Sequence, residues 1–305
     1  MSTAFTGSAL SPKLTDALLE ARNADGGFGY LAGQPSATEP TALAAMALSL
    51  LQGDSAQEAT GRARQWLETT QLASGAWPAR PPDTSESWTG ALALLALADS
   101  DRYAEARRRG LKQLVDIGGR QIKVSQSVFA IDGTLRGWPW SPETFSWVEP
   151  TAYALIALKR LRAEAGPEAG KRITEGEALL FDRAVERGGW NYGNRKVYGQ
   201  PYPPYAETTA VALLALQDHP GRPEIARSLD TLRQAVSGGP ASGLQVSWAM
   251  LCLATFGLPT DGLDERLATT YKRTAFFGRV PTLAVALLAS AGPAGLEPFR
   301  LGARS

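Results

Sequence analysis

Segments of two kinds alternate along this chain. The first kind is amphipathic: over residues 58–70, apolar side chains recur at helical spacing while charged residues occupy the opposite face. The second kind, as in residues 88–97, is apolar on almost every side. A helix without a polar face is buried all round. The alternation therefore predicts an outer amphipathic helix, a turn and a fully buried inner helix.

This unit recurs with a spacing of roughly 40 to 60 residues, which indicates an array of supersecondary units. The openings of the inner helices align at residues 39–43, 86–90, 149–153 and 207–211, with weaker copies at 245–249 and 280–284. The preceding turns align at residues 26–28, 75–77, 137–139 and 188–190. Each unit is expected to bury its apolar face against its neighbours.

The most complete copy resembles a family motif. Its matching residues are Arg62, Ala63, Trp66, Leu67, Gln71, Gly75 and Trp77. At this spacing they look like a complete QW motif of the squalene-cyclase and prenyltransferase repeat family. Residues 13–28 are a partial copy with Arg22 in place of Gln, and residues 146–155 resemble the opening of an inner helix in hopene-cyclase-type proteins.

The resemblance covers about residues 12–290. It implies an all-α fold, an α/α toroid with two concentric layers of helices and five to six helical hairpins. In the family, the N-termini of the inner helices surround one mouth of a central cavity. We expect residues 1–11 to be a loose leader and residues 12–305 to form a single domain, with residues 264–290 as a short, degenerate closing or capping repeat. The loops 118–136 and 190–206 are long enough to be functional or partly structured.

Composition narrows the function classes. Of the 305 residues, 44% are hydrophobic and 20% are charged, and the formal net charge is +1. Bulk electrostatics therefore gives no indication of nucleic-acid binding. The longest apolar runs would form helices of roughly 16 Å, too short for an integral membrane segment. Without a secretory signal in residues 1–6, the expected location is cytoplasmic. A single cysteine excludes an internal disulfide.

Four glutamates stand where inner helices open: Glu39, Glu86, Glu149 and Glu207. Family members that protonate an alkene or epoxide carry an Asp-x-Asp-Asp-Thr-Ala motif at such an opening. Alignment on the Thr-Ala pair places Glu207, and likewise Glu149, on the middle aspartate, so these two are the catalytic candidates. The complete motif does not occur in the sequence. The alternative is that all four side chains simply favour the positive end of a helix.

Aromatic side chains crowd the turns and helix openings. Their ring faces suit a carbocation or an isoprenoid chain, although the family uses its turn tryptophans to staple helices. Arginines in the long loops suit a diphosphate, although a solvated surface is the alternative. The candidates for substrate binding are Trp147, Tyr205, Trp248, Phe145, Tyr153, Trp88, Arg136 and Arg195.

Metal and thiol chemistry have little support. Prenyltransferase β subunits bind zinc with an Asp-x-Cys pair, whereas Cys252 lies in an apolar helix after Met250 and Leu251. His219 is expected on a surface loop. We therefore predict no metal ligands and no cofactor.

Three hypotheses remain open. The chain is a terpene cyclase-like enzyme that cyclises or isomerises an isoprenoid or similar apolar substrate in the central cavity, without the usual acid motif. Alternatively, it binds a polyprenyl or other apolar molecule without catalysis, or it is an interaction subunit of a homo-oligomer or a heteromeric complex. An apolar cavity of several hundred Å³ would favour the first two hypotheses.

Overall fold

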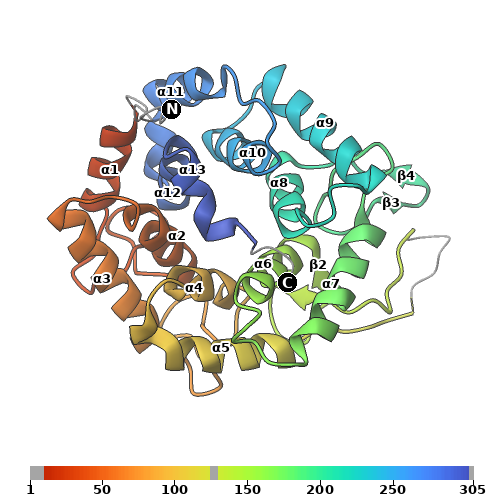
Figure 1. Cartoon of the computed structure of the whole chain (residues 1–305), viewed down its shortest axis with the longest axis horizontal. Coiled ribbons are helices and arrows are strands. Elements are labelled where there is room, and N and C mark those ends of the chain that lie inside the picture. Colours follow the sequence, from red (N-terminus) through yellow and green to blue (C-terminus); the bar gives the residue numbers. More distant parts are fainter. Residues whose placement is uncertain (1–9, 124–129, 302–305) are drawn as a thin grey trace.

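The computed structural model describes residues 10–123 and 130–301. In this part of the chain, six inner helices form a closed ring inside six outer helices (Figure 1). The outer helices are α1 (Ser11–Glu20), α3 (Asp54–Thr69), α5 (Ala104–Asp116), α7 (Ala169–Arg183), α9 (Pro223–Ser237) and α11 (Leu263–Thr274). The inner helices are α2 (Thr38–Leu48), α4 (Gly90–Leu97), α6 (Val148–Arg160), α8 (Ala206–Ala215), α10 (Gly243–Thr255) and α12 (Val280–Ser290). The predicted α/α toroid is confirmed.

The two layers follow from the two kinds of helix. Every residue of α4 is buried, because its neighbours α2 and α6 and the outer helix α5 cover it on all sides. The outer helix α9 instead buries only a stripe, namely Ile225, Ser228, Leu232 and Val236. The other outer helices bury a similar single face. Helix α12 packs against both α10 and α2, and this contact closes the ring.

Tryptophans tie three of the turns before inner helices to the outer layer. The indole Nε1 of Trp77 donates a hydrogen bond of 2.6 Å to the carbonyl of Leu67, near the end of α3. Trp138 and Trp190 repeat this bond, at 2.8 Å to Leu114 and 2.7 Å to Leu180. The interpretation of these tryptophans as staples is confirmed.

Threonines in the inner helices hold the same turns from the other side. The backbone N–H groups of Phe28, Trp138 and Trp190 donate to the hydroxyls of Thr41, Thr151 and Thr209, at 2.9, 3.0 and 2.9 Å. The Thr-Ala pair used to align the repeats therefore has a structural reason. The threonine satisfies a buried backbone group that the turn would otherwise leave unpaired.

A glycine is required at the turn because the next outer helix approaches its backbone. Gly75 has φ of +91°, and a Cβ atom there would lie 2.4 Å from the carbonyl oxygen of Arg109 in α5. Gly188 has the same relation to Arg227 in α9, at 2.5 Å. A side chain at either position would push the outer helix away.

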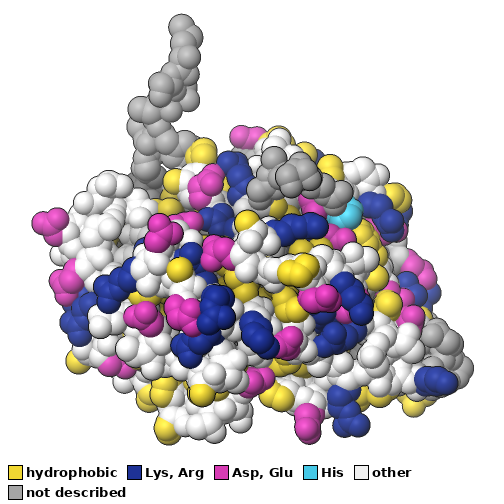
Figure 2. Space-filling model, turned by 60° about the horizontal axis from the view of Figure 1, so that its bottom comes forward, with side chains coloured by type: hydrophobic (Ala, Val, Ile, Leu, Met, Phe, Trp, Pro, Cys, Tyr) yellow, Lys and Arg dark blue, Asp and Glu magenta, His cyan; other side chains and the backbone are white. Residues whose placement is uncertain are grey.

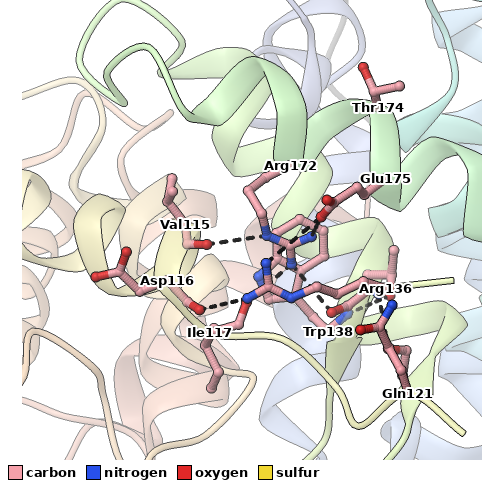
Figure 3. Close-up of polar contacts among 12 residues, drawn as sticks. Val115, Asp116, Ile117, Gln121, Arg136, Trp138, Arg172, Thr174 and Glu175 are labelled. Atoms are coloured by element: carbon pink, nitrogen blue, oxygen red, sulfur yellow. Dashed lines mark hydrogen bonds and ion pairs between the residues drawn. The ribbon is translucent and has the colours of Figure 1, made fainter. Parts of the chain in front are cut away.

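An arginine from the fourth outer helix, α7, ties down the turn before α6. The Arg172 guanidinium lies 4.0 Å from the centroid of the Trp138 ring, and it donates to backbone carbonyls between α5 and β1 (Figure 3). These acceptors are Val115 (3.2 Å), Ile117 (3.1 Å) and Gly137 (3.4 Å). Arg136 lies beside it, donates to the Asp116 carbonyl at 2.8 Å and stands 3.8 Å from Glu175. Arg136 thus belongs to an outer-layer cluster.

The long loops are partly structured, as predicted. In the described part of the first, Arg120 forms an isolated bridge with Phe145. Just after this loop, β1 (Trp138–Pro139) pairs antiparallel with β2 (Ser146–Trp147), so that Trp138 is opposite Trp147. In the second, β3 (Lys196–Val197) pairs with β4 (Gln200–Pro201). Three short 3₁₀ segments complete the described elements: η1 (Asp101–Tyr103), η2 (Ala275–Gly278) and η3 (Glu297–Phe299).

Two predictions at the chain ends change. The sixth unit closes the ring as expected, but both of its helices are of full length: α11 packs on α10, and α12 packs on α10, α1 and α2. After it, α13 (Pro293–Leu296) and η3 turn back into the ring (Figure 1). Of the predicted leader, residues 1–9 lie outside the described part, whereas Leu10 is already buried in the core.

The C-terminal segment covers the end of the ring where the inner helices finish. Phe299 is fully buried. The side chain of Gln217, just after α8, donates to the Phe299 carbonyl at 2.9 Å, and Arg160 at the end of α6 donates to the carbonyls of Glu297 and Arg300. We call the opposite end of the ring, where the inner helices begin, the mouth.

The exterior carries both signs of charge. Figure 2 shows Lys and Arg side chains interspersed with Asp and Glu over one face of the molecule. In the described ranges, none of the helices combines the length and the apolar character needed to cross a lipid bilayer.

Candidate active site at the mouth of the ring

Three carboxylates occupy the same register at the mouth. Glu39, Glu149 and Glu207 are each the second residue of an inner helix, in α2, α6 and α8, and each is half-buried. The N-cap positions before them are Ala37, Trp147 and Tyr205, none of which caps its helix with a side chain. We refer to the three glutamates as the mouth carboxylates. They are close enough for the charges of Glu39 and Glu207 to act on Glu149.

The pKa of Glu149 lies well above the ordinary range of a glutamate. Burial, followed by repulsion from Glu207, raises its pKa to about 7. The Thr208 hydroxyl opposes this shift by donating a hydrogen bond of 3.3 Å to Oε1 of Glu149. At neutral pH, a large fraction of this carboxyl group therefore carries a proton.

Glu39 and Glu207 have partners of their own. Burial raises the pKa of both carboxyls, and the positive charge of Arg279 opposes the shift in each case. The Tyr30 hydroxyl donates a short bond of 2.6 Å to Oε2 of Glu39. Ser242 hydrogen-bonds to Glu207. The fourth glutamate, Glu86, is not part of this group, because its Oε2 accepts a bond of 3.1 Å from Gln113 in the outer helix α5.

Aromatic side chains form a column along the ring interior below the mouth carboxylates. The column consists of consecutive ring contacts: Trp140 to Trp88 (4.8 Å between centroids), Trp88 to Tyr153 (5.5 Å), Tyr153 to Trp248 (6.2 Å) and Trp248 to Phe299 (5.1 Å). Trp88 is half-buried, whereas Tyr153 and Trp248 are only 7% and 3% exposed. The structure thus brings together Trp88, Tyr153 and Trp248, and their rings fill much of the interior.

The other predicted aromatic residues lie at the rim. Phe145 and Trp147 line an apolar pocket of about 490 Å³ together with Ile122, Ile131 and Leu135. Tyr205 is 39% exposed and lies 5.0 Å from Tyr192. These side chains border the mouth on its α6 and α8 side.

The predicted arginines are placed elsewhere. Arg136 belongs to the cluster around Trp138, and the Arg195 guanidinium donates to the Ala130 carbonyl. The cation that acts on Glu39 and Glu207 is Arg279, which sequence reasoning missed, as it missed Tyr30. Their positions in the sequence could have indicated them: Arg279 directly precedes an inner helix, and Tyr30 follows an aromatic turn.

A second group of ionisable side chains lies where α6 and α8 end. Glu177, Asp218 and His219 are close enough to hold a metal ion. The Lys159 ammonium already pairs with Glu177 and Asp218 at 2.7 and 2.8 Å, so a lysine offsets part of the charge of the two carboxylates. His219 was expected on the surface, but it is half-buried, with Nε2 2.8 Å from Glu177. Cys252 is buried, as predicted.

No protein-family model matches this chain, and no curated protein matches it. Solved structures do. The type II terpene cyclase MstE from Scytonema is 16% identical, with a TM-score of 0.59 over 94% of this chain and 97% of that one. A variant of MstE has been solved in complex with its substrate, geranylgeranyl dihydroxybenzoate.

The same fold also occurs in an unrelated enzyme class. The α-1,6-mannanase GH76A of Salegentibacter sp. HEL1_6 is 11% identical, with a TM-score of 0.62 over 94% of this chain and 98% of that one. A protein from Actinoplanes is 16% identical, with a TM-score of 0.56 over 95% and 98% of the two chains. At these identities the likeness establishes the α/α toroid and leaves the reaction to be argued from the site.

Proposed function

We propose that this protein is a terpene cyclase-like enzyme that binds an isoprenoid or similar apolar substrate at the mouth and starts its cyclisation or isomerisation by protonation. The observation that supports this most is Glu149, a carboxyl group with a pKa of about 7 held beside Glu207 above aromatic rings. A general acid must be protonated at the working pH and must lie close to its acceptor. Glu149 meets the first condition, which a solvent-exposed glutamate does not.

The roles follow from the surroundings. Glu149 transfers its proton to the substrate, and the carboxylate that remains keeps the hydrogen bond from Thr208. The faces of Trp88 and Tyr153 stabilise the cation formed. Glu207, whose pKa Arg279 and Ser242 hold down against burial, accepts a proton when the cation collapses to an alkene. The proton count then balances, and the product is an isomer of the substrate.

The acid strength of Glu149 limits which substrates it can protonate. A carboxyl group with a pKa of about 7 is a weaker acid than an ordinary glutamic acid. Protonation by such a group favours an epoxide oxygen or a polarised alkene over an unactivated alkene, because the better acceptor demands less of the acid.

The test uses geranylgeraniol and its terminal epoxide as probes, with products identified by mass spectrometry. Wild-type protein should give a cyclic isomer of unchanged mass. Glu149→Gln should abolish turnover while the protein stays folded, because Gln keeps the shape and removes the transferable proton. Glu86→Gln is the matched control, since Glu86 has the same aligned position but lies apart from the mouth carboxylates. Equal turnover in Glu149→Gln and wild type would contradict the proposal.

A second candidate function is binding of an apolar molecule without turnover. The aromatic column favours it, because Tyr153, Trp248 and Phe299 are buried in contact with one another and occupy part of the ring interior. Tight binding of both probes with no product, unaffected by Glu149→Gln, would support this alternative. Cytoplasmic location, homo-oligomerisation and association with a partner subunit remain predictions.

A further inference from the structure

A pocket of about 980 Å³ opens at one side of the mouth, among the start of α10, the outer helix α11 and the start of α12. Glu207 contributes to its lining, so the pocket is continuous with the mouth carboxylates. Its basic lining residues are Arg266, Arg273 and Arg279, and its acidic ones are Glu207 and Glu265. The pocket therefore differs in charge from the acidic side of the mouth formed by α2, α6 and α8.

Two of these arginines have guanidinium groups available for a ligand. Arg266 donates to the carbonyl of Gly239. Neither Arg273 nor Arg279 takes part in any of the ion pairs found within residues 10–123 and 130–301, and both are exposed. The guanidinium group is the side chain best suited to bind carboxylate and phosphate oxygens, often through two parallel bonds.

The start of α12 adds to the positive potential. Helices α2, α6 and α8 carry a glutamate in the first turn, whereas α12 has no acidic residue there and has Arg279 at its N-cap. The partial positive charge of this helix end is thus not compensated by its own first turn. Thr282, one of the lining residues, lies in the same turn.

An unusual backbone segment holds Arg279 in place. Ala275, Phe276 and Phe277 have φ of +43°, +50° and +53°, and Gly278 follows at +65°. Such a left-handed run costs roughly 1–2 kcal/mol per non-glycine residue. It is kept because the Phe276 side chain is buried and its backbone is hydrogen-bonded on both sides. The Phe276 N–H donates to the Thr274 hydroxyl at 3.1 Å, and the Phe276 carbonyl accepts from the Arg279 N–H at 3.1 Å. Strained segments of this kind concentrate at functional sites.

The facing helix α10 has a glycine where its backbone comes close to the buried ring of Phe276. A Cβ atom at Gly243, the first residue of α10, would lie 2.3 Å from Cε1 of Phe276. The wall of the pocket is therefore a fixed structure built from α10, η2 and α12.

We propose that this pocket binds an oxyanion, a phosphate, diphosphate or carboxylate, carried by the substrate, with Arg273 and Arg279 as its ligands. The inference rests on the proposed function and names the polar end of its substrate. The acidic side of the mouth repels an oxyanion, and the arginine side attracts it. This asymmetry orients an amphiphile with its anionic end toward α11 and its apolar end over Glu149 and the aromatic column.

Calorimetric titration with inorganic pyrophosphate tests the site itself. We expect Arg273→Gln and Arg279→Gln each to weaken binding roughly 10- to 100-fold, the change that follows loss of a hydrogen bond to a charged group. Both side chains are exposed, so the variants should fold normally. Lys272→Gln is the matched control, because Lys272 is the exposed neighbour of Arg273 but does not line this pocket. Affinity that is unchanged in both arginine variants, or lowered equally by Lys272→Gln, would overturn the proposal.

A second titration tests whether the pocket binds the head group of a substrate or only a free anion. Geranylgeranyl phosphate should bind at least tenfold more tightly than geranylgeraniol, and Arg279→Gln should remove that preference. Equal affinity for ester and alcohol, with pyrophosphate still bound, would overturn the head-group assignment. All titrations are repeated on Glu149→Gln protein. Because they measure binding alone, failure of the proton-donor role would leave the oxyanion result intact, and the converse also holds.

Discussion

Thr208 in the first turn of α8 donates a 3.3 Å hydrogen bond to Glu149 in the first turn of α6. The bond joins two neighbouring inner helices and lowers the pKa of a carboxyl group that burial and Glu207 both raise. The protonation state of the candidate acid is therefore set by three inner-helix residues acting together.

Thr208→Val should raise the pKa of Glu149 further above 7, since it removes the one hydrogen bond that favours the ionised form. An enzyme that needs this group protonated would then stay active to higher pH. The measurement is the alkaline limb of the pH profile of kcat/KM, together with infrared titration of the carboxyl band, which does not depend on activity. Thr255→Val, which removes a local bond to Leu251 at the far end of α10, is the control. A limb that does not move, or moves to lower pH, would contradict the assignment of Glu149.

Glu149→Gln should flatten the pH dependence of stability. The folded-state pKa of about 7 exceeds the ordinary value of 4.5, so the unfolded chain loses this proton at lower pH than the folded protein. Stability is thus greatest below pH 4.5 as far as this group is concerned, and it falls as the pH rises through 7.

Glu149→Gln should lose the part of this decline in stability that is caused by Glu149. Relative to wild type, it should gain on the order of 1–3 kcal/mol between pH 4.5 and 8. Urea denaturation at the two pH values measures the difference. Glu39 and Glu207, whose pKa values shift in the same direction, leave a residual slope in the variant. Parallel curves for variant and wild type would show that Glu149 has an ordinary pKa.

Trp77→Phe should destabilise the fold without changing its shape. The substitution keeps an aromatic ring in the turn but removes the indole N–H that bonds to Leu67 at 2.6 Å. The loss should be roughly 1–3 kcal/mol, because a buried carbonyl loses its partner. Trp140→Phe is the comparison. Within the described residues the Trp140 indole N–H makes no hydrogen bond, and the ring is only half-buried. Chemical denaturation of both variants checks this, and equal losses would argue against the staple.

Periodicity was sufficient to predict the two layers of helices, whereas closure into a toroid was expected from the family resemblance. The contrast between residues 58–70 and 88–97 already separates outer from inner helices, because water contact decides which faces must be polar. It was also sufficient to place Glu39, Glu149 and Glu207 at helix openings, since register carries over between copies. The depth of a side chain was harder to predict: Trp248 was expected at a helix start but is the sixth residue of α10 and is buried in the aromatic column.

What sequence did not indicate depends on contacts across the ring. Arg279 belongs to the last hairpin, and its effect on Glu39 in the first arises only when the ring closes. The C-terminal segment gave no periodic signal, because α13 and η3 are too short to complete two helical turns. Phe299 reaches Trp248 through tertiary folding alone.

Closure of the ring through α12 and α2 has a consequence for synthesis of the chain. An open array of repeats covers its two end units with polar capping repeats. In this closed ring the first and last units instead cover each other, through the contact of α12 with α2. Until α12 has left the ribosome, the flanks of α2 and α10 that it will cover stay exposed, and those helices are apolar on almost every side. The nascent protein is therefore an incomplete arc with exposed apolar helix faces, and its dependence on chaperones should last at least until α12 emerges.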